Sequence, residues 1–335
     1  MFYHFKRSAS RRIMLAALAI LPAAGTAQAL AAGEDFPNRP IRVVVPYAAG
    51  GGTDVLARYV TRKVSELLGQ SIVIENRPGA GTSIGASDIA RSPADGYHLL
   101  WGDSGSFAVN PHIHPNLSYD PLKDFAPVTL TLTGTLILLA RDGLGVNSVQ
   151  DLIAYAKANP DKLNYGTPGN GTPHHLFMEG FKRDSGGLQI EHIAYKGEAP
   201  AIQDMLGGTL DVMFSGARQA AAQKDSGRIR PLAASGTQRN PVMPEVPTLA
   251  ETGLDGNAYE YWHAVVAPAG TPDAVVDKLN TAFRAALTDP EVTHWLRTAT
   301  GTQPSPTTPA ELAAHMNSES AKAAILVRDI GLRQP

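Results

Sequence analysis

Short runs of apolar and β-branched residues alternate along the chain with longer stretches in which apolar residues recur at helical spacing. The first run, Ile41–Tyr47, is followed by an amphipathic stretch that begins near Val55 and ends at Gly69. Consecutive β-branched residues suit a strand covered on both faces, and apolar residues three and four apart suit a helix. The repetition of such units predicts an α/β fold with mainly parallel sheets.

The same pattern predicts the remaining elements. Further strands are expected at Ser71–Asn76, His98–Asp103, Val128–Ala140, Leu163–Gly166, Gln189–Tyr195, Leu210–Phe214, Ile229–Ala234 and Tyr259–Pro268. Helices are expected to begin near Ser83, Ser148, Pro173, Glu198, Pro272 and Pro309, where caps and prolines stand. Two strands are unusually long, and Val128–Ala140 is interrupted by Gly134. We interpret these long strands as two crossings between two domains.

Four strand-to-helix turns are rich in glycine or capping residues: Gly50–Asp54, Pro78–Ser83, Thr167–Pro173 and Lys196–Glu198. In open α/β sheets such turns lie at the carboxyl ends of strands, where ligands bind. Unpaired N–H groups at a helix N-terminus favour an anion, and glycine lets the backbone approach it. The turns therefore predict a cleft for a small carboxylate, and a β-branched residue at Gly51 should block binding.

The same glycine-rich segments match the motifs of nucleotide-binding sites less well than they match a carboxylate site. Gly79–Gly85 resembles a dinucleotide fingerprint with one extra residue, and Asp103 follows near the position of a ribose-binding acid, but Pro78 stiffens the turn. The loop at Gly50 lacks the Gly-Lys-Ser/Thr of a phosphate-binding loop. Neither cofactor is expected.

Other segments resemble catalytic or metal-binding motifs. Gly102–Gly105 resembles a serine-protease nucleophile segment, so an exported serine hydrolase using Ser104 or Ser106 is the alternative function. The histidines occur as His112 with His114 and as His174 with His175, without a nearby acidic cluster, and are interpreted as structural. There is no cysteine, so disulfides and thiol chemistry are excluded and no metal is expected.

Some residues at strand ends allow two interpretations. Lys196 could pair with an anionic ligand or be a solvated loop lysine. Aromatic residues could pack on the ligand or fill the interdomain core, with the core favoured: Tyr47, Trp101, Tyr195 and Trp262.

The N-terminal residues have the pattern of a signal peptide. Basic residues precede a short apolar run, Ile13–Leu21, and Ala27–Ala29 fits a cleavage site, with Ala29–Ala31 as a second choice. Arg11 and Arg12 also leave a twin-arginine signal open. Removing the four basic residues of this segment changes the formal net charge from −2 to −6. A soluble, mildly acidic chain of two domains is expected, with no nucleic acid as partner.

A set of ordered motifs resembles the Bug family, the periplasmic solute-binding proteins associated with tripartite tricarboxylate transporters. The matching segments are Arg39–Ile41, Pro46–Asp54, Asn76–Gly81, Pro93–Tyr97, Asn110–Pro111, Tyr165–Thr172, His175–Leu176, Tyr195–Gly197, Gly207–Asp211, Pro244–Glu251 and Ala267–Pro272. They span essentially the whole chain after the signal peptide.

The resemblance implies a two-domain periplasmic binding protein of type II-like α/β fold, with each mainly parallel sheet flanked by helices and two crossing strands between them. The implied domains are residues 32–128 with about 260–335, and about 129–259, after a cleaved segment 1–31. Carried over by motif, the ligand-binding residues are Tyr47, Gly51, Gly52, Thr53, Asp54, Ala80, Gly81, Thr82, Ser83, Ser104, Ser106, Thr167, Gly169, Gly171, Thr172, His175, Tyr195 and Lys196. The implied protein is monomeric, non-catalytic and without cofactor, and its partner is a cytoplasmic-membrane permease.

One position departs from the family pattern: Thr82 stands where a further glycine is common. This leaves the ligand open among dicarboxylates, tricarboxylates, acidic amino acids and aromatic acids. A sensing role and a structural or adhesive surface protein remain the other interpretations.

Overall fold

The computed structural model describes residues 36–254 and 259–332, and residues 37–335 form one compact unit. The predicted signal peptide lies outside the described residues. No helix in the described part of the chain has the length and apolar character that a membrane crossing requires.

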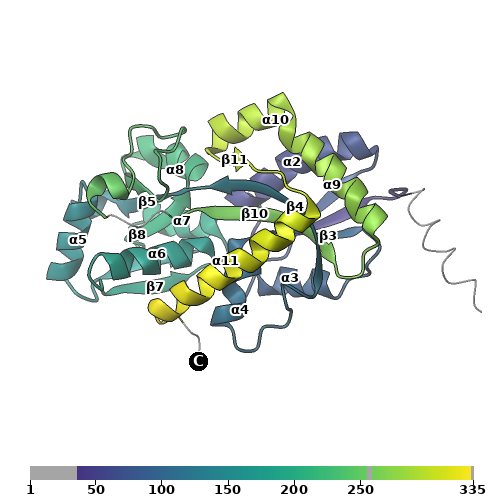
Figure 1. Cartoon of the computed structure of the whole chain (residues 1–335). Helices are drawn as coiled ribbons and strands as arrows, with labels where there is room; N and C mark the ends of the chain where they lie inside the picture. The colour runs from purple at the N-terminus through teal and green to yellow at the C-terminus, as the bar shows by residue number, and fades with distance from the viewer. Residues whose placement is uncertain (1–35, 255–258, 333–335) are drawn as a thin grey trace, which may run out of the picture. The chain divides into compact units, whose positions relative to one another are not determined.

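The first sheet has six strands in the order β11-β4-β10-β3-β1-β2 (Figure 1). Their bounds are β1 Ile41–Val45, β2 Ile72–Asn76, β3 His98–Asp103, β4 Phe125–Gly134, β10 Tyr261–Pro268 and β11 Gln303–Pro304. Strand β1 runs parallel to β2 and β3, whereas β10 runs antiparallel to β3 and β4, and β11 antiparallel to β4.

The second sheet has five strands in the order β7-β6-β8-β5-β9. Their bounds are β5 Leu136–Arg141, β6 Leu163–Thr167, β7 Ile190–Ala194, β8 Val212–Gly216 and β9 Ile229–Ala234. Strand β6 is parallel to β7 and β8, and β5 is antiparallel to β8 and β9. We call the first sheet with α2–α4 and α9–α11 the first lobe, and the second sheet with α5–α8 the second lobe.

Both sheets are mixed, which corrects the expectation of mainly parallel sheets. Strand β4 ends at Gly134, and the chain continues into β5 at Leu136. The chain therefore enters the second sheet from the side that faces the first sheet. The return, from β9 to β10, enters the first sheet in the same way. Strands that begin at the junction must run opposite to strands that end there, so β5 and β10 are antiparallel to their neighbours.

The helices begin and end at residues that explain their boundaries. Their bounds are α2 Gly52–Leu68, α3 Ser83–Ala90, α4 Asn110–Ile113, α5 Val149–Ala158, α6 Pro173–Asp184, α7 Glu198–Leu206, α8 Ala217–Gln223, α9 Asp273–Thr288, α10 Pro290–Trp295 and α11 Pro309–Asp329. Helix α2 ends on Gly69 in the left-handed conformation, as its pattern predicted. The alanine-rich helix α8 follows β8 directly and was not predicted.

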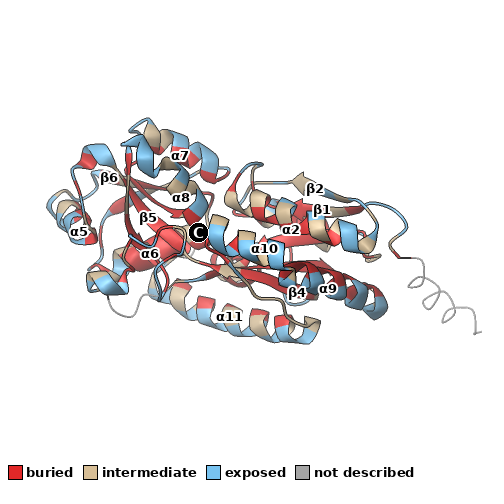
Figure 2. Ribbon diagram, turned by 90° about the horizontal axis from the view of Figure 1, so that it is seen from above, coloured by how far each residue is buried: buried red, intermediate tan, exposed pale blue. Residues whose placement is uncertain are grey.

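The core lies between the sheets and the apolar faces of the helices, while the outer helix faces are exposed (Figure 2). Trp101 is fully buried beside Phe283 in the first lobe, and Tyr165 and Phe214 are fully buried in the second. Trp262 is buried and stacks on Phe107, with ring centroids 5.8 Å apart. The tryptophans at strand ends therefore belong to the core of the first lobe.

Candidate ligand-binding site

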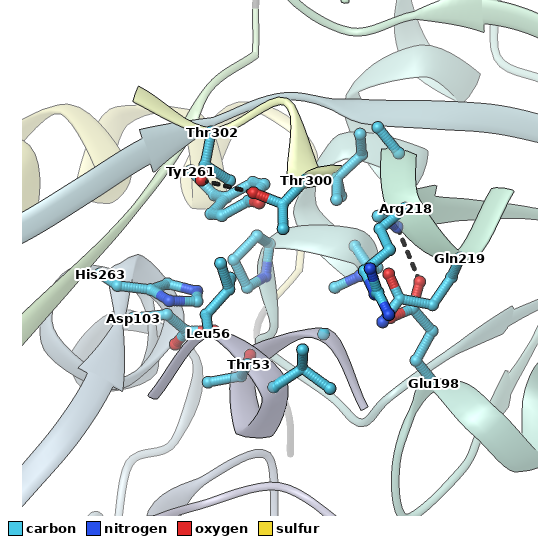
Figure 3. A pocket seen from close by; sticks show the side chains of 17 residues that line it. Thr53, Leu56, Asp103, Glu198, Arg218, Gln219, Tyr261, His263, Thr300 and Thr302 are labelled. Carbon is cyan, nitrogen blue, oxygen red and sulfur yellow. Dashed lines mark hydrogen bonds between the residues drawn. The ribbon is translucent and has the colours of Figure 1, made fainter. Parts of the chain in front are cut away.

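A cavity lies where the two lobes meet, and residues of both lobes line it (Figure 3). The centre of a water-sized molecule can reach about 40 Å³ of it, and the cavity is partly open to the surface. Its lining residues are Gly52, Thr53, Val55, Leu56, Asp103, Leu136, Pro173, His174, Glu198, Gly216, Ala217, Arg218, Gln219, Tyr261, His263, Thr300 and Thr302. Three of the four turns singled out in the sequence therefore contribute residues to one cavity.

Four helices begin at this cavity without a side-chain cap. They are α2 from the first lobe and α6, α7 and α8 from the second. Away from the cavity, α5, α10 and α11 are capped by Ser148, Asp289 and Thr308, whereas α3, α4 and α9 also begin without a side-chain cap. Uncapped N-termini leave backbone N–H donors and partial positive charge facing the cavity. This arrangement suits an anion.

In the turn Gly50–Asp54, each glycine has its own role. Gly50 has φ +79°, whereas Gly51 and Gly52 have ordinary backbone angles. A Cβ on Gly52 would lie 3.2 Å from Gln219 Nε2, so this glycine lets α2 approach the second lobe. Asp54 is buried and accepts hydrogen bonds from Gly50 N, Arg58 and Asn76, and it does not line the cavity. Its carboxylate holds the turn in shape.

The residues of the turn Ala80–Ser83 are not among those that line the cavity. Ala80 and Thr82 both have positive φ, and the Thr82 hydroxyl is 3.0 Å from Ser106 Oγ and 3.1 Å from Asn110 Nδ2. Ala80 and Ser83 instead line a separate surface depression. The backbone of Gly81 lies against that of Asn170, since a Cβ on Gly81 would fall 1.8 Å from Asn170 O.

Asp103 is the centre of a buried network in the first lobe. Its carboxylate accepts hydrogen bonds from the Tyr47 hydroxyl and from Ser106 N at 3.0 Å, and Ser106 Oγ lies 3.1 Å from it. Burial raises the pKa of Tyr47, so its phenol is a donor at neutral pH. Among the described residues, no hydrogen bond joins Ser104 or Ser106 to a histidine. The side-chain partners of Ser106 Oγ are the Asp103 carboxylate and the Thr82 hydroxyl.

Hydroxyl and imidazole groups shape the turn Thr167–Thr172 from within. Thr172 Oγ1 donates to Gly169 O at 2.8 Å, and Gly171 N donates to His175 Nδ1 at 3.1 Å. Burial lowers the pKa of His175 to about 3, which keeps Nδ1 free to accept. It is the next residues along the chain, Pro173 and His174, that line the cavity.

The turn after β7 places its predicted residues outside the cavity. The Tyr195 hydroxyl donates to Asp204 at 2.8 Å, and Lys196 is exposed. Glu198, two residues further on, is buried and lines the cavity. A Cβ on Gly197 would lie 2.9 Å from the Ala48 side chain, so this turn also touches the first lobe.

Sequence reasoning missed the residues that strand β10 brings to the cavity. Trp101 Nε1 donates to His263 Nδ1 at 3.2 Å, which places the proton of the neutral ring on Nε2. Burial lowers the pKa of His263 to about 4, so this ring is an uncharged donor. The signal was a histidine in an otherwise apolar strand. Tyr261, Thr300 and Thr302 line the same side (Figure 3).

Comparison with known proteins identifies the family. The family model described as tripartite tricarboxylate transporter family receptor matches residues 56–332. The chain belongs to this family. Protein BugT of Bordetella pertussis is 34% identical over 321 residues, which cover 96% of this chain and 98% of BugT. The resemblance to the Bug family is thereby confirmed.

Solved structures of similar proteins agree with this receptor fold. The periplasmic binding protein BugD has a TM-score of 0.85 and 33% identity, covering 90% of this chain and 100% of BugD. An R. palustris protein with adipate has a TM-score of 0.85 and 37% identity over 89% of this chain and 99% of its own. MatC from Rhodopseudomonas palustris with bound malate has a TM-score of 0.82 and 32% identity, covering 87% of this chain and 100% of MatC. The family and these neighbours are binding proteins, and the two-domain solute-binding fold is confirmed.

Proposed function

We propose that this receptor captures a small carboxylate-bearing metabolite in the cavity between its lobes. The observation that carries the proposal is the set of four uncapped helix N-termini, drawn from both lobes, at one cavity. They hold an anion through backbone N–H groups. The adipate and malate in two neighbours support a carboxylate as ligand.

Binding is proposed to close the two lobes by a hinge. The proposed domains are residues 32–128 with about 260–335, and about 129–259, and the chain passes between the sheets at Thr135 and after β9. The single-residue connection at Thr135 is of the kind that absorbs the change of backbone angles in hinge closure. The protein is proposed to act as a monomer without enzymatic activity.

The cellular role follows from the family. We infer that residues 1–31 are removed on export and that the protein works in the periplasm. The loaded receptor would deliver its ligand to the membrane subunits of a tripartite tricarboxylate-type transporter, or report the ligand to a sensor. The matched receptor family supports the first of these roles.

The proposal is tested by thermal unfolding of the purified protein with adipate, malate, succinate, citrate and glutamate. A ligand that binds only the folded state stabilises it by about 2.7 kcal/mol at a hundredfold excess over Kd. We expect a saturable rise in Tm with at least one acid and none with sodium chloride at equal ionic strength. If no carboxylate gives a saturable rise, the proposed function is wrong.

A further inference from the structure

Strand β10 brings two polar side chains to the wall of the cavity. Tyr261 and His263 are two residues apart, so both side chains lie on the same face of the strand, and both line the cavity (Figure 3). They are only 8% and 3% exposed, in a strand that is buried along its whole length. Their hydrogen-bond partners therefore show what these side chains can offer to a ligand.

The His263 ring has one nitrogen bonded in the core of the first lobe and the other open to the cavity. Its Nδ1 accepts from Trp101 Nε1, so the neutral ring carries its proton on Nε2. Nε2 has no hydrogen-bond partner among the described residues, and it keeps accessible surface. Asp103 lies opposite His263 on strand β3, but its oxygens accept from Tyr47 and Ser106 instead. His263 therefore presents a free N–H donor to the cavity.

The Tyr261 hydroxyl is likewise free to donate. Gly134 lies opposite Tyr261 on β4, and a Cβ there would fall 2.6 Å from Tyr261 Oη, so this glycine makes room for the phenol. The hydroxyl has no hydrogen-bond partner among the residues that the structure describes, and it too keeps accessible surface. Burial raises the pKa of Tyr261, so the phenol keeps its proton at neutral pH. By contrast, the hydroxyls of Thr300 and Thr302 bond to each other at 2.8 Å.

Building on the proposed function, we propose that Tyr261 and His263 determine which ligand the cavity accepts, by donating hydrogen bonds to an acceptor group of the bound molecule. Both donors are neutral and belong to the first lobe, whereas three of the four uncapped helices at the cavity, α6 to α8, belong to the second. A ligand without an acceptor at this wall would leave two enclosed donors unpaired, which is unfavourable. The pair therefore selects by hydrogen bonding and not by charge.

The first test is Tyr261→Phe, which keeps the ring and removes only the hydroxyl. Isothermal titration calorimetry uses whichever of adipate, malate, succinate, citrate and glutamate raises the Tm of the wild-type protein most. We expect the affinity to fall at least roughly tenfold. The urea midpoint without ligand should stay unchanged, because the hydroxyl has no partner in the described protein.

The control Tyr155→Phe removes a hydroxyl on α5, away from the cavity, and should leave the affinity unchanged. If Tyr261→Phe binds the acid as tightly as the wild-type protein, this inference is wrong and the proposed function stands. If none of the five acids binds the wild-type protein, the proposed function fails and this inference fails with it.

The second test separates donation by His263 from the shape of its ring. His263→Phe keeps a ring without nitrogen, whereas His263→Gln places an amide N–H near the position of Nε2. We expect His263→Phe to lose affinity for the same acid at least roughly tenfold and His263→Gln to recover part of that loss. Nitrogen-15 NMR of the wild-type ring should show the proton on Nε2 at pH 7. Equal loss in the two variants, or a proton on Nδ1, would overturn the role assigned to His263.

Discussion

At the scale of residues, glycine determines how closely the two lobes approach. Gly105 has an ordinary backbone conformation, but a Cβ there would lie 2.7 Å from Gly171 O and 3.2 Å from Thr172 Cα. Both are backbone atoms of the opposite lobe, which cannot turn aside as a flexible side chain can. Gly81 likewise makes room for the backbone of Asn170, whereas Gly197 makes room for the side chain of Ala48.

Gly105→Ala should therefore weaken ligand binding by obstructing closure. We expect affinity for the ligand found by the thermal screen to fall at least roughly tenfold, and the free energy of unfolding to change by about 1 kcal/mol or less. Calorimetric titration and urea unfolding measure the two quantities. Gly207→Ala is the matched control, because a Cβ there meets only ordinary contacts at 3.4 Å and beyond. Unchanged affinity in Gly105→Ala would show that the lobes bind ligand without this close approach.

At the scale of elements, the helices with a side-chain cap, α5, α10 and α11, all begin away from the cavity. Helix α11 begins with a complete capping box, in which Thr308 Oγ1 accepts from Glu311 N and Glu311 accepts from Thr308 N at 2.8 Å. It packs on β4 and on the π-helical turn Gly105–Val109. Helices α2, α6, α7 and α8 have no such cap and leave their N–H groups to the cavity.

Loss of the α11 cap should cost stability. Thr308→Ala leaves Glu311 N without its side-chain acceptor, and we expect the free energy of unfolding in urea to fall by about 1 kcal/mol. Thr308→Ser retains the hydroxyl and should restore most of that loss. If serine and alanine destabilise the protein equally, the box does not contribute as the geometry indicates.

At the scale of the whole molecule, sheet topology assembles the site and buries several histidines. Burial lowers the pKa of His192 and His263 to about 4 and that of His175 to about 3, from an ordinary 6.5. His175 and His192 stack with centroids 4.1 Å apart in the second lobe, while His263 belongs to the first. Neutral histidines are therefore part of the folded state of both lobes.

Stability should consequently fall as the pH drops from about 6.5 towards 4. In this range the histidines bind protons in the unfolded chain but not in the folded protein. The free energy of unfolding therefore falls by on the order of 1 kcal/mol per pH unit for each histidine. Above pH 6.5 the histidines are neutral in both states, so their contribution to the free energy of unfolding is complete. Urea unfolding at pH 7, 6 and 5 measures the slope, and His192→Phe, which keeps an aromatic ring in the stack, should reduce it. A constant or rising stability between pH 7 and 5 would contradict this account.

The sequence by itself determined the features that depend on neighbouring residues. Strand and helix positions, the cap at Ser148, the capping residue before Pro309 and the glycine-rich turns follow from backbone preferences over a few residues. The interruption at Gly134 also marked where the chain passes between sheets. Helix α8 was missed because it has only 7 residues and follows β8 without an intervening loop, so too few positions show a helical period.

Only the tertiary structure decided which side chains face the cavity. The order of strands places β10 beside β3, so His263 meets Trp101, 162 positions earlier in the chain, and local pattern cannot report this. The hydroxyls of Thr82 and Ser106 belong to one buried network, whereas Glu198 lines the cavity. The hydrogen-bond partners that a residue finds in other strands or in the other lobe depend on the sheet topology and on how the lobes meet. Those partners determine which residues shape the turns and which line the cavity.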